Sequence, residues 1–314
     1  MASKQSEQLT TRYKACVAAL SANPQMPLVE MRALLAHTMG DVTAEPGGVD
    51  YIETDAAGLP AMWAAPKGCS EDRVLLCSHG GGYVTCSRYT HRKLFGHVAK
   101  AVGCRALIVD YRLAPENPHP RPVNDMATAY GWLLGQGIKP DHIALIGDSA
   151  GGGLAVTTIL RVRQQGLPLP AATMPLSPWL DMEATGGTFE TNKAKDVLNS
   201  REIMLGMAAT FLGENGNRRD PLANPLLGDL RGLPPVYIQV GSYEVLLDDS
   251  RALAEALRRA DGEVKLDVYP EMQHAFQLLA GVAPEADDAI GKLAAWVRPK
   301  LALGSARGAP ESLG

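Results

Sequence analysis

A Gly-Asp-Ser-Ala-Gly motif at 147–151 has the G-x-S-x-G spacing of a serine nucleophile held at a sharp turn. An apolar strand pattern at 142–146 precedes it, and a helical pattern at 151–165 follows it. Glycine is needed at both ends of the motif because a Cβ there would collide with the neighbouring strand and helix. The hydroxyl of Ser149 then projects from a helix N-terminus, where the N–H of Ala150 can stabilise negative charge. These features predict acyl transfer with Ser149 as the nucleophile.

A His-Gly-Gly-Gly-Tyr motif at 79–83 follows directly after a buried-strand pattern at 73–78. Consecutive glycines let the backbone approach a substrate closely and aim N–H groups at a developing oxyanion. We predict that the N–H groups of Gly80 and Gly81, with that of Ala150, form this oxyanion hole. Removing one such donor in comparable enzymes costs about 3–4 kcal/mol of transition-state stabilisation.

Chain order selects the general base. On α/β sheets that carry a G-x-S-x-G turn, the acid and then the histidine follow the serine. Of the seven histidines, only His274 follows Ser149. It comes shortly after a strand pattern at 264–269, on a loop at the sheet edge where ligands bind. We therefore predict that His274 is the base.

Three carboxylates follow the strand pattern at 236–240 and could supply the third member of a triad. Glu244 is nearest to the end of the strand, whereas Asp248 or Asp249 occupies the expected N-cap of a helix at 250–260. We predict that Glu244 is the acid and keep Asp248 as the alternative. The acid of the triad would hold the tautomer of the histidine and stabilise the imidazolium.

The elements that position these residues alternate between strand and helix along most of the chain. Strand patterns cover 49–54, 61–65, 73–78, 105–110, 142–146, 171–176, 236–240 and 264–269. Helical patterns cover 91–102, 123–134, 151–165, 250–260 and 285–301. This order predicts an α/β fold with a mostly parallel central sheet flanked by helices.

Two parts of the chain fall outside this alternation. Amphipathic helices at 7–20 and 27–39 precede the sheet. A polar segment rich in glycine and asparagine interrupts the alternation at 181–227, which we interpret as an insertion. The tail at 304–314 is small and polar, and we expect it to be mobile.

Composition excludes several classes of protein. The 314 residues are 46% hydrophobic and 20% charged, as in ordinary globular proteins. A net charge of -4 gives no basic surface for nucleic acid. The N-terminus is polar and no stretch of about 18 apolar residues occurs, so we expect a cytoplasmic protein without a membrane partner. Five scattered cysteines without a C-x-x-C pair argue against disulfides and zinc.

The motifs together resemble the hormone-sensitive-lipase-like bacterial esterases, often called family IV, which have the α/β-hydrolase fold. The matching segments are HGGGY at 79–83, YRLAPE at 111–116, GDSAGGG at 147–153, DPLANP at 220–225 and HAF at 274–276. The similarity extends over 50–296. It implies a helical cap made of 1–45 and 181–227 over a catalytic domain made of 46–180 and 228–303. Most family members carry aspartate where this chain has Glu244.

We also expect Tyr83, Cys86 and Asp148, which lie in or beside the two motifs, to form the substrate site. The resemblance assigns Asp148 to the positions that brace the loops of the site. Cys86 is expected to line the pocket.

The predicted function is hydrolysis of short-acyl carboxylic esters through a Ser-His-Glu triad and a covalent acyl-enzyme. The partner is a small-molecule ester, and the chemistry needs no cofactor or metal. A homodimer paired through the 264–269 edge strand is a further prediction. The same triad could serve a lactone hydrolase, an amidase or an acyltransferase. A non-catalytic receptor on this fold would lack the histidine, which this chain has.

Overall fold

Eight strands form a single sheet in the order β1-β2-β4-β3-β5-β6-β7-β8 in the computed structural model, which describes residues 2–304. The strands are β1 Val49–Asp55, β2 Pro60–Pro66, β3 Ser70–Ser78, β4 Cys104–Val109, β5 Ile143–Asp148, β6 Ala172–Leu176, β7 Val236–Gly241 and β8 Val264–Tyr269. The β1–β2 and β2–β4 pairs are antiparallel, and the remaining pairs are parallel. The predicted mostly parallel sheet is confirmed.

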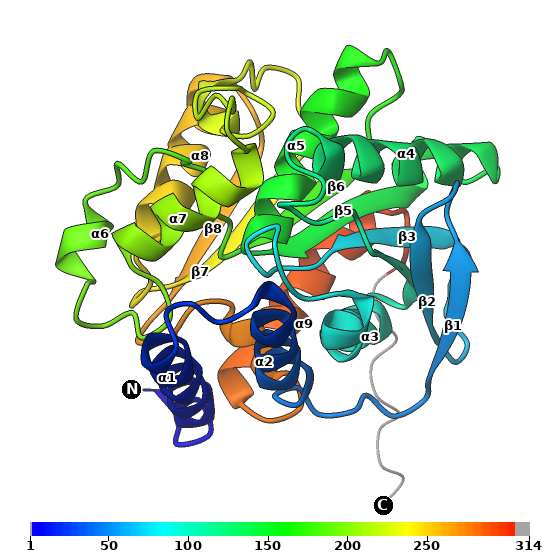
Figure 1. Ribbon diagram of the computed structural model, residues 1–314. Helices are drawn as coiled ribbons and strands as arrows, with labels where there is room; N and C mark the ends of the chain where they lie inside the picture. The colour runs from blue at the N-terminus through cyan, green and yellow to red at the C-terminus, as the bar shows by residue number, and fades with distance from the viewer. Residues whose placement is uncertain (1, 305–314) are drawn as a thin grey trace, which may run out of the picture.

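Helices cover both faces of this sheet (Figure 1). They are α1 Glu7–Ala22, α2 Leu28–Gly40, α3 Arg88–Val102, α4 Arg121–Gly135, α5 Ala150–Gln164, α6 Thr188–Thr191, α7 Arg201–Leu212, α8 Leu247–Arg259 and α9 Pro284–Lys300, with short 3-10 turns at Pro140–His142, Pro225–Leu227 and Phe276–Leu279. All six residues of β5 are buried. Its uninterrupted apolar run follows from this double cover, since neither face of the strand meets water.

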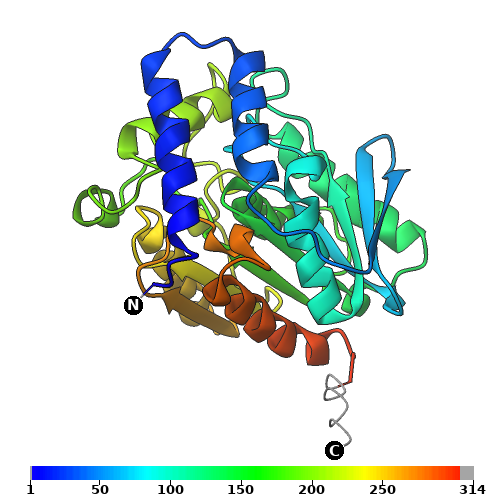
Figure 2. The same cartoon turned by 90° about the horizontal axis from the view of Figure 1, so that it is seen from below.

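The core is divided by the sheet into two clusters. Residues of α4, α5 and α8 pack on one face, and residues of α3 and α9 pack on the other. Figure 2, seen from below, shows α9 and α3 in front of the sheet, with α1 and α2 at one end of it. Because the carboxyl ends of the parallel strands share one edge, loops from β3, β5, β6, β7 and β8 meet there.

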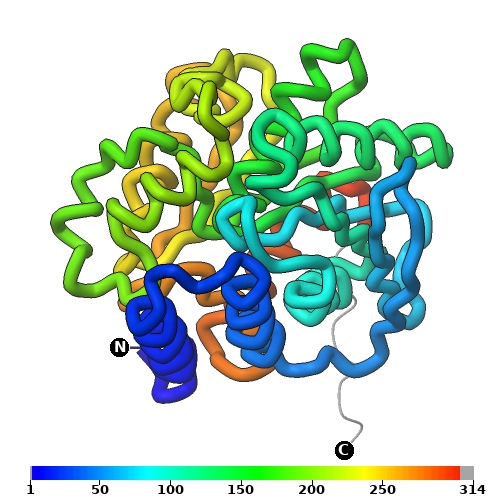
Figure 3. The backbone as a smooth tube through the Cα atoms, in the orientation of Figure 1, coloured from blue at the N-terminus to red at the C-terminus, as the bar shows by residue number. Residues whose placement is uncertain are grey.

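The segments outside the alternating pattern gather at that edge. The tube in Figure 3 shows the chain leaving the sheet after β6, running through α6 and α7 near the two N-terminal helices, and returning to β7. Helix α2 is held in place by Arg32, whose Nε donates to the Val84 carbonyl at 2.9 Å. The same guanidinium makes a bidentate pair with Glu116 at 2.7 Å for each bond.

Helix α8 begins at Leu247, so Asp248 and Asp249 lie in its first turn, and the predicted N-cap role for them is wrong. Carboxylates in a first turn still stabilise a helix through its dipole. We predict that the tail at 304–314 is mobile, but its residues 305–314 lie outside the described part of the chain. None of the helices in the described range is long and apolar enough to cross a membrane.

Candidate active site

Ser149 stands on a strained turn between β5 and α5, with φ 55° and ψ -122°. A Cβ at Gly147 would lie 2.2 Å from the carbonyl oxygen of Gly151, and a Cβ at Gly151 would lie 2.0 Å from that of Ser78. Both contacts are far inside van der Waals range, so the predicted need for glycine at the two positions is confirmed. The strain is maintained because strand, turn and helix are packed this closely.

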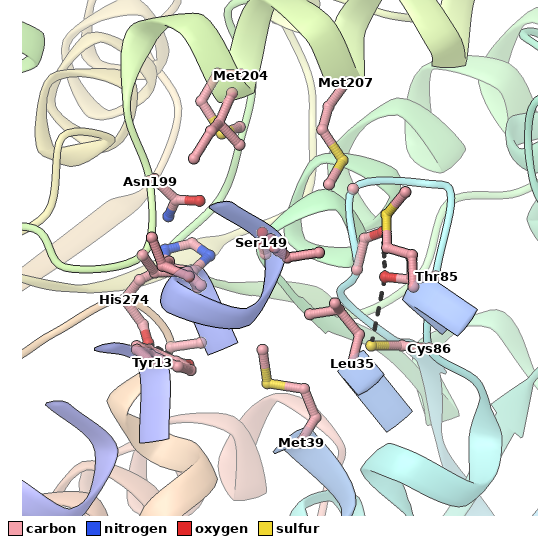
Figure 4. A pocket seen from close by; sticks show the side chains of 18 of the residues that line it. Tyr13, Leu35, Met39, Thr85, Cys86, Ser149, Asn199, Met204, Met207 and His274 are labelled. Carbon is pink, nitrogen blue, oxygen red and sulfur yellow. Dashed lines mark hydrogen bonds between the residues drawn. The ribbon is translucent and has the colours of Figure 1, made fainter. Parts of the chain in front are cut away.

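His274 lies on the loop after β8, and its Nδ1 is 2.8 Å from Oε2 of Glu244. Glu244 has no exposed surface, and His274 is 4% exposed. The imidazole and the hydroxyl of Ser149 project into the same cavity (Figure 4). A hydrogen bond between Nδ1 and a carboxylate leaves Nε2 facing outward as the basic atom.

The competing carboxylates point elsewhere. Asp248 accepts a hydrogen bond from the backbone of Thr188 at 2.9 Å. Asp249 accepts from the N–H groups of Leu180 and Asp181 at 2.8 and 3.0 Å. Both aspartates therefore hold the insertion against α8, and the geometry favours Glu244 as the partner of the histidine.

Ser177 supports the second carboxylate oxygen of Glu244. Its hydroxyl donates to Oε1 at 2.7 Å, and the N–H of Gly241 donates to the same oxygen. The Ser177 hydroxyl in turn accepts a hydrogen bond from the N–H of Ala275 at 3.0 Å. One hydroxyl thus links the acid loop to the histidine loop. The sequence contained a signal for it, because Ser177 directly follows β6 at the edge where the loops meet.

The carboxylate and the imidazole shift each other's pKa. Burial raises the pKa of Glu244 above its ordinary value, while hydrogen bonds from His274, Ser177 and Gly241 oppose this shift. Burial disfavours the imidazolium form of His274, but the hydrogen bond and charge of Glu244 outweigh it and raise the pKa of the histidine. Each group therefore stabilises the charged form of the other, and the imidazole gains affinity for a proton.

The raised pKa of His274 leads to a prediction for the pH dependence. The general base must be neutral, so activity is present above its pKa and is lost as the pH falls through it. Because that pKa is raised from 6.5, we expect the acid limb of kcat/KM to have its midpoint above pH 6.5. The measurement is kcat/KM for an ester without ionisable groups, from about pH 5 to pH 9. A rate that stays constant down to pH 5 would contradict a role for His274 as base.

The glycines whose N–H groups are free to bind an oxyanion lie one residue further along the chain than predicted. The N–H of Gly80 donates to Oδ1 of Asp148 at 3.1 Å, so it is not available to an oxyanion. Gly81 and Gly82 line the cavity. Across residues 2–304, no acceptor is found for their N–H groups. The prediction for Gly80 is wrong, and the candidate donors are Gly81, Gly82 and Ala150.

Asp148 lines the cavity, but both of its oxygens are engaged by the protein. Besides Gly80, it bonds Nε2 of His91 at 3.2 Å. Burial opposes ionisation, yet the charge and hydrogen bond of His91 lower the pKa of Asp148. Its carboxylate braces the glycine loop, as the family resemblance implies, and is not free to bind a substrate.

Tyr83 does not reach the cavity, contrary to expectation. It is 1% exposed, and its ring stacks on Phe211 of α7 with centroids 3.7 Å apart. The tyrosine therefore fastens the glycine loop to α7. Cys86, in contrast, lines the cavity as predicted. Burial raises the pKa of its thiol to about 12, which excludes a reactive thiolate at neutral pH.

The cavity has a volume of about 290 Å³ and is mostly apolar. Most of its apolar wall comes from α1, α2 and the segment 198–207, which lie outside the alternating strand and helix pattern, and the rest of the lining comes from the loops that carry the triad and the glycine motif. The apolar lining includes Leu20, Met31, Leu35, Met39, Leu198, Ile203, Met204, Met207 and Leu278. Methionine adapts its shape easily, so this wall can fit acyl groups of different shape.

The helical segments are also hydrogen-bonded to the triad loops. Tyr13 of α1 donates from its hydroxyl to the carbonyl of His274 at 2.9 Å. Asn192 donates from its side-chain amide to the carbonyls of Ser242 and Glu244 at 3.0 and 2.8 Å. Sequence patterns could not reveal Tyr13 or Asn192, because each meets a partner that is distant in the chain.

Comparisons with known proteins agree with this geometry. Residues 75–278 match the family described as alpha/beta hydrolase fold. The chain is 40% identical to an acetyl-hydrolase of Streptomyces hygroscopicus, over 88% of this chain and 97% of that protein. It is 37% identical to an esterase of Acinetobacter venetianus, over 72% and 74% of the two chains.

Solved structures give the same result. A crystal structure of an esterase from the bacterial hormone-sensitive lipase family has a TM-score of 0.91 and 41% identity, and the match covers 96% of this chain and 99% of that one. The chain therefore belongs to the α/β-hydrolase family, among the bacterial hormone-sensitive-lipase esterases. As an enzyme it is a carboxylic-ester hydrolase.

Proposed function

We propose that this enzyme hydrolyses short-acyl carboxylic esters through Ser149, His274 and Glu244. The observation that carries the proposal is the buried pair of His274 and Glu244, with Nδ1 and Oε2 2.8 Å apart. His274 lines the same cavity as Ser149. A non-catalytic receptor has no use for this pair, whereas a hydrolase needs it to activate its nucleophile.

The reaction takes two steps. His274 accepts the hydroxyl proton through Nε2 as Ser149 attacks the ester carbonyl, and the N–H groups of Gly81, Gly82 and Ala150 hold the resulting oxyanion. The imidazolium then gives its proton to the departing alcohol, leaving an acyl-serine. A water molecule, deprotonated by the same imidazole, attacks the acyl carbon and releases the acid and the free serine.

A preference for short acyl chains is supported by the size of the cavity, which is about 290 Å³. Larger ligands are usually held in pockets at or above that volume. The relative from Streptomyces hygroscopicus is called an acetyl-hydrolase. A related esterase, 36% identical with a TM-score of 0.88, was crystallised and soaked with p-nitrophenyl butyrate. Both names fit a small acyl group.

A substrate panel tests this proposal. We expect kcat/KM for p-nitrophenyl esters to peak between acetate and hexanoate and to fall by about tenfold or more at longer chains, since the apolar wall then has no room. Matched γ-lactones and p-nitroanilides are expected to react at least about tenfold more slowly than the best ester. A lactone or anilide that exceeds the esters would assign the site to one of those reactions instead.

We propose further that 1–45 and 181–227 form a cap over a catalytic domain made of 46–180 and 228–303. The lining of the cavity by α1, α2 and α7 supports this division. Strand β8 is at the edge of the sheet and could pair with a second copy, which supports the proposed homodimer through Val264–Tyr269. The five free cysteines agree with a reducing, cytoplasmic location.

A further inference from the structure

Asn199 differs from the other polar residues on the wall of the catalytic cavity in its hydrogen bonding. Its Nδ2 is buried and has no hydrogen-bond partner within residues 2–304. The other buried polar side chains of the wall, apart from the nucleophile, are bonded to the protein. Their bonds join Tyr13 to the His274 carbonyl, Thr85 to the Gly81 carbonyl, His91 to Asp148, and His274 to Glu244. An unpaired buried amide is costly, so its donor needs a partner that the protein does not supply.

The backbone of Asn199 is anchored to the loop that carries the triad acid. Its N–H donates to Oδ1 of Asp196 at 2.9 Å. The other oxygen of Asp196 accepts from the N–H of Val245, next to Glu244, also at 2.9 Å. Ser200 follows and caps α7 by accepting from Ile203. The amide is therefore presented from a position that is fixed relative to the triad.

The location of Asn199 indicates which part of a substrate it would meet. Figure 4 shows Asn199 beside His274, whereas Thr85 and Cys86 lie on the opposite side of Ser149. His274 protonates the leaving oxygen, so the alcohol part of an ester must extend on the histidine side. In Figure 4 the amide nitrogen of Asn199 points toward His274, so the donor lies on the side where the alcohol extends.

We propose that Asn199 donates a hydrogen bond to an oxygen atom carried by the alcohol portion of the substrate. This inference rests on the proposed function and deepens it. The preferred substrates are esters of alkoxy- or hydroxy-substituted alcohols, such as monoesters of diols and their ethers, and unsubstituted alkyl esters are poorer. An apolar alcohol leaves the amide unpaired in the complex, whereas an acceptor oxygen satisfies it.

Two nearly isosteric substrates test the proposal, 2-methoxyethyl butyrate and n-butyl butyrate, in which an ether oxygen replaces one methylene. The quantity is the ratio of their kcat/KM values. In Asn199→Leu, which has a similar shape and no donor, we expect this ratio to fall about tenfold from that of the wild type. The intrinsic difference in reactivity between the two esters cancels, because it is the same for both proteins.

The control is Ile203→Ala, which changes the same wall without removing a donor and should leave the ratio within about twofold. An unchanged ratio in Asn199→Leu, or an equal fall in Ile203→Ala, overturns the proposal. If the leucine variant does not fold, Asn199→Asp removes the N–H donor at nearly constant shape and is judged by the same ratio. Wild-type protein that hydrolyses neither ester would instead refute the proposed function itself.

Discussion

Ser149→Ala is expected to lower kcat for ester hydrolysis by at least about 10³-fold, because only substrate binding and the oxyanion hole remain without the nucleophile. The protein should stay folded, since the Ser149 side chain makes no capping hydrogen bond at α5. Alanine at φ 55° carries about the same backbone strain as serine. The measurements are kcat for p-nitrophenyl butyrate and the midpoint of thermal unfolding.

A matched control is Ser250→Ala in α8. The hydroxyl of Ser250 is buried, has no hydrogen-bond partner in the part of the chain that the structure describes, and is not among the residues lining the cavity. That variant should keep its activity. His274→Ala should be about as damaging as Ser149→Ala, and the double variant little worse than either, since the two residues act as one unit. More than a tenth of the activity left in Ser149→Ala, or losses that multiply, would contradict the mechanism.

The sequence was sufficient for the features that local geometry dictates. A Cβ at 147 or 151 would collide with backbone, so glycine at both positions identified the turn that carries Ser149. Chain order alone selected His274. The strand and helix pattern was also recoverable from periodicity, because fully buried parallel strands are continuous apolar runs.

The errors and omissions have a common physical origin in contacts between distant segments. Whether the N–H of Gly80 faces a substrate depends on Asp148, which reaches it from β5. The orientation of Tyr83 depends on Phe211 in the insertion. Tyr13 contacts the His274 loop across 261 positions in the chain. No local pattern encodes such pairs, so they appear only when the helices are placed over the sheet.

Glu244→Gln should lower kcat by about 10³- to 10⁴-fold, because the wrong tautomer of the histidine would be favoured. Oε1 of Glu244 accepts hydrogen bonds from Ser177 and Gly241, so the amide oxygen of glutamine must take that place. The amide NH₂ then faces Nδ1 of His274 and donates to it. Nε2 consequently carries the proton and cannot accept one from Ser149.

The aspartates of α8 provide the comparison, because each change replaces a carboxylate by its amide. Asp248→Asn and Asp249→Asn alter hydrogen bonds to Thr188, Leu180 and Asp181, and we expect each to cost about 1 kcal/mol of stability. Their kcat should remain within about threefold of the wild type, since neither carboxylate touches the histidine. The measurements are kcat and the free energy of unfolding for all three variants. Activity that survives in Glu244→Gln and is lost in Asp248→Asn would transfer the role of acid to the aspartate.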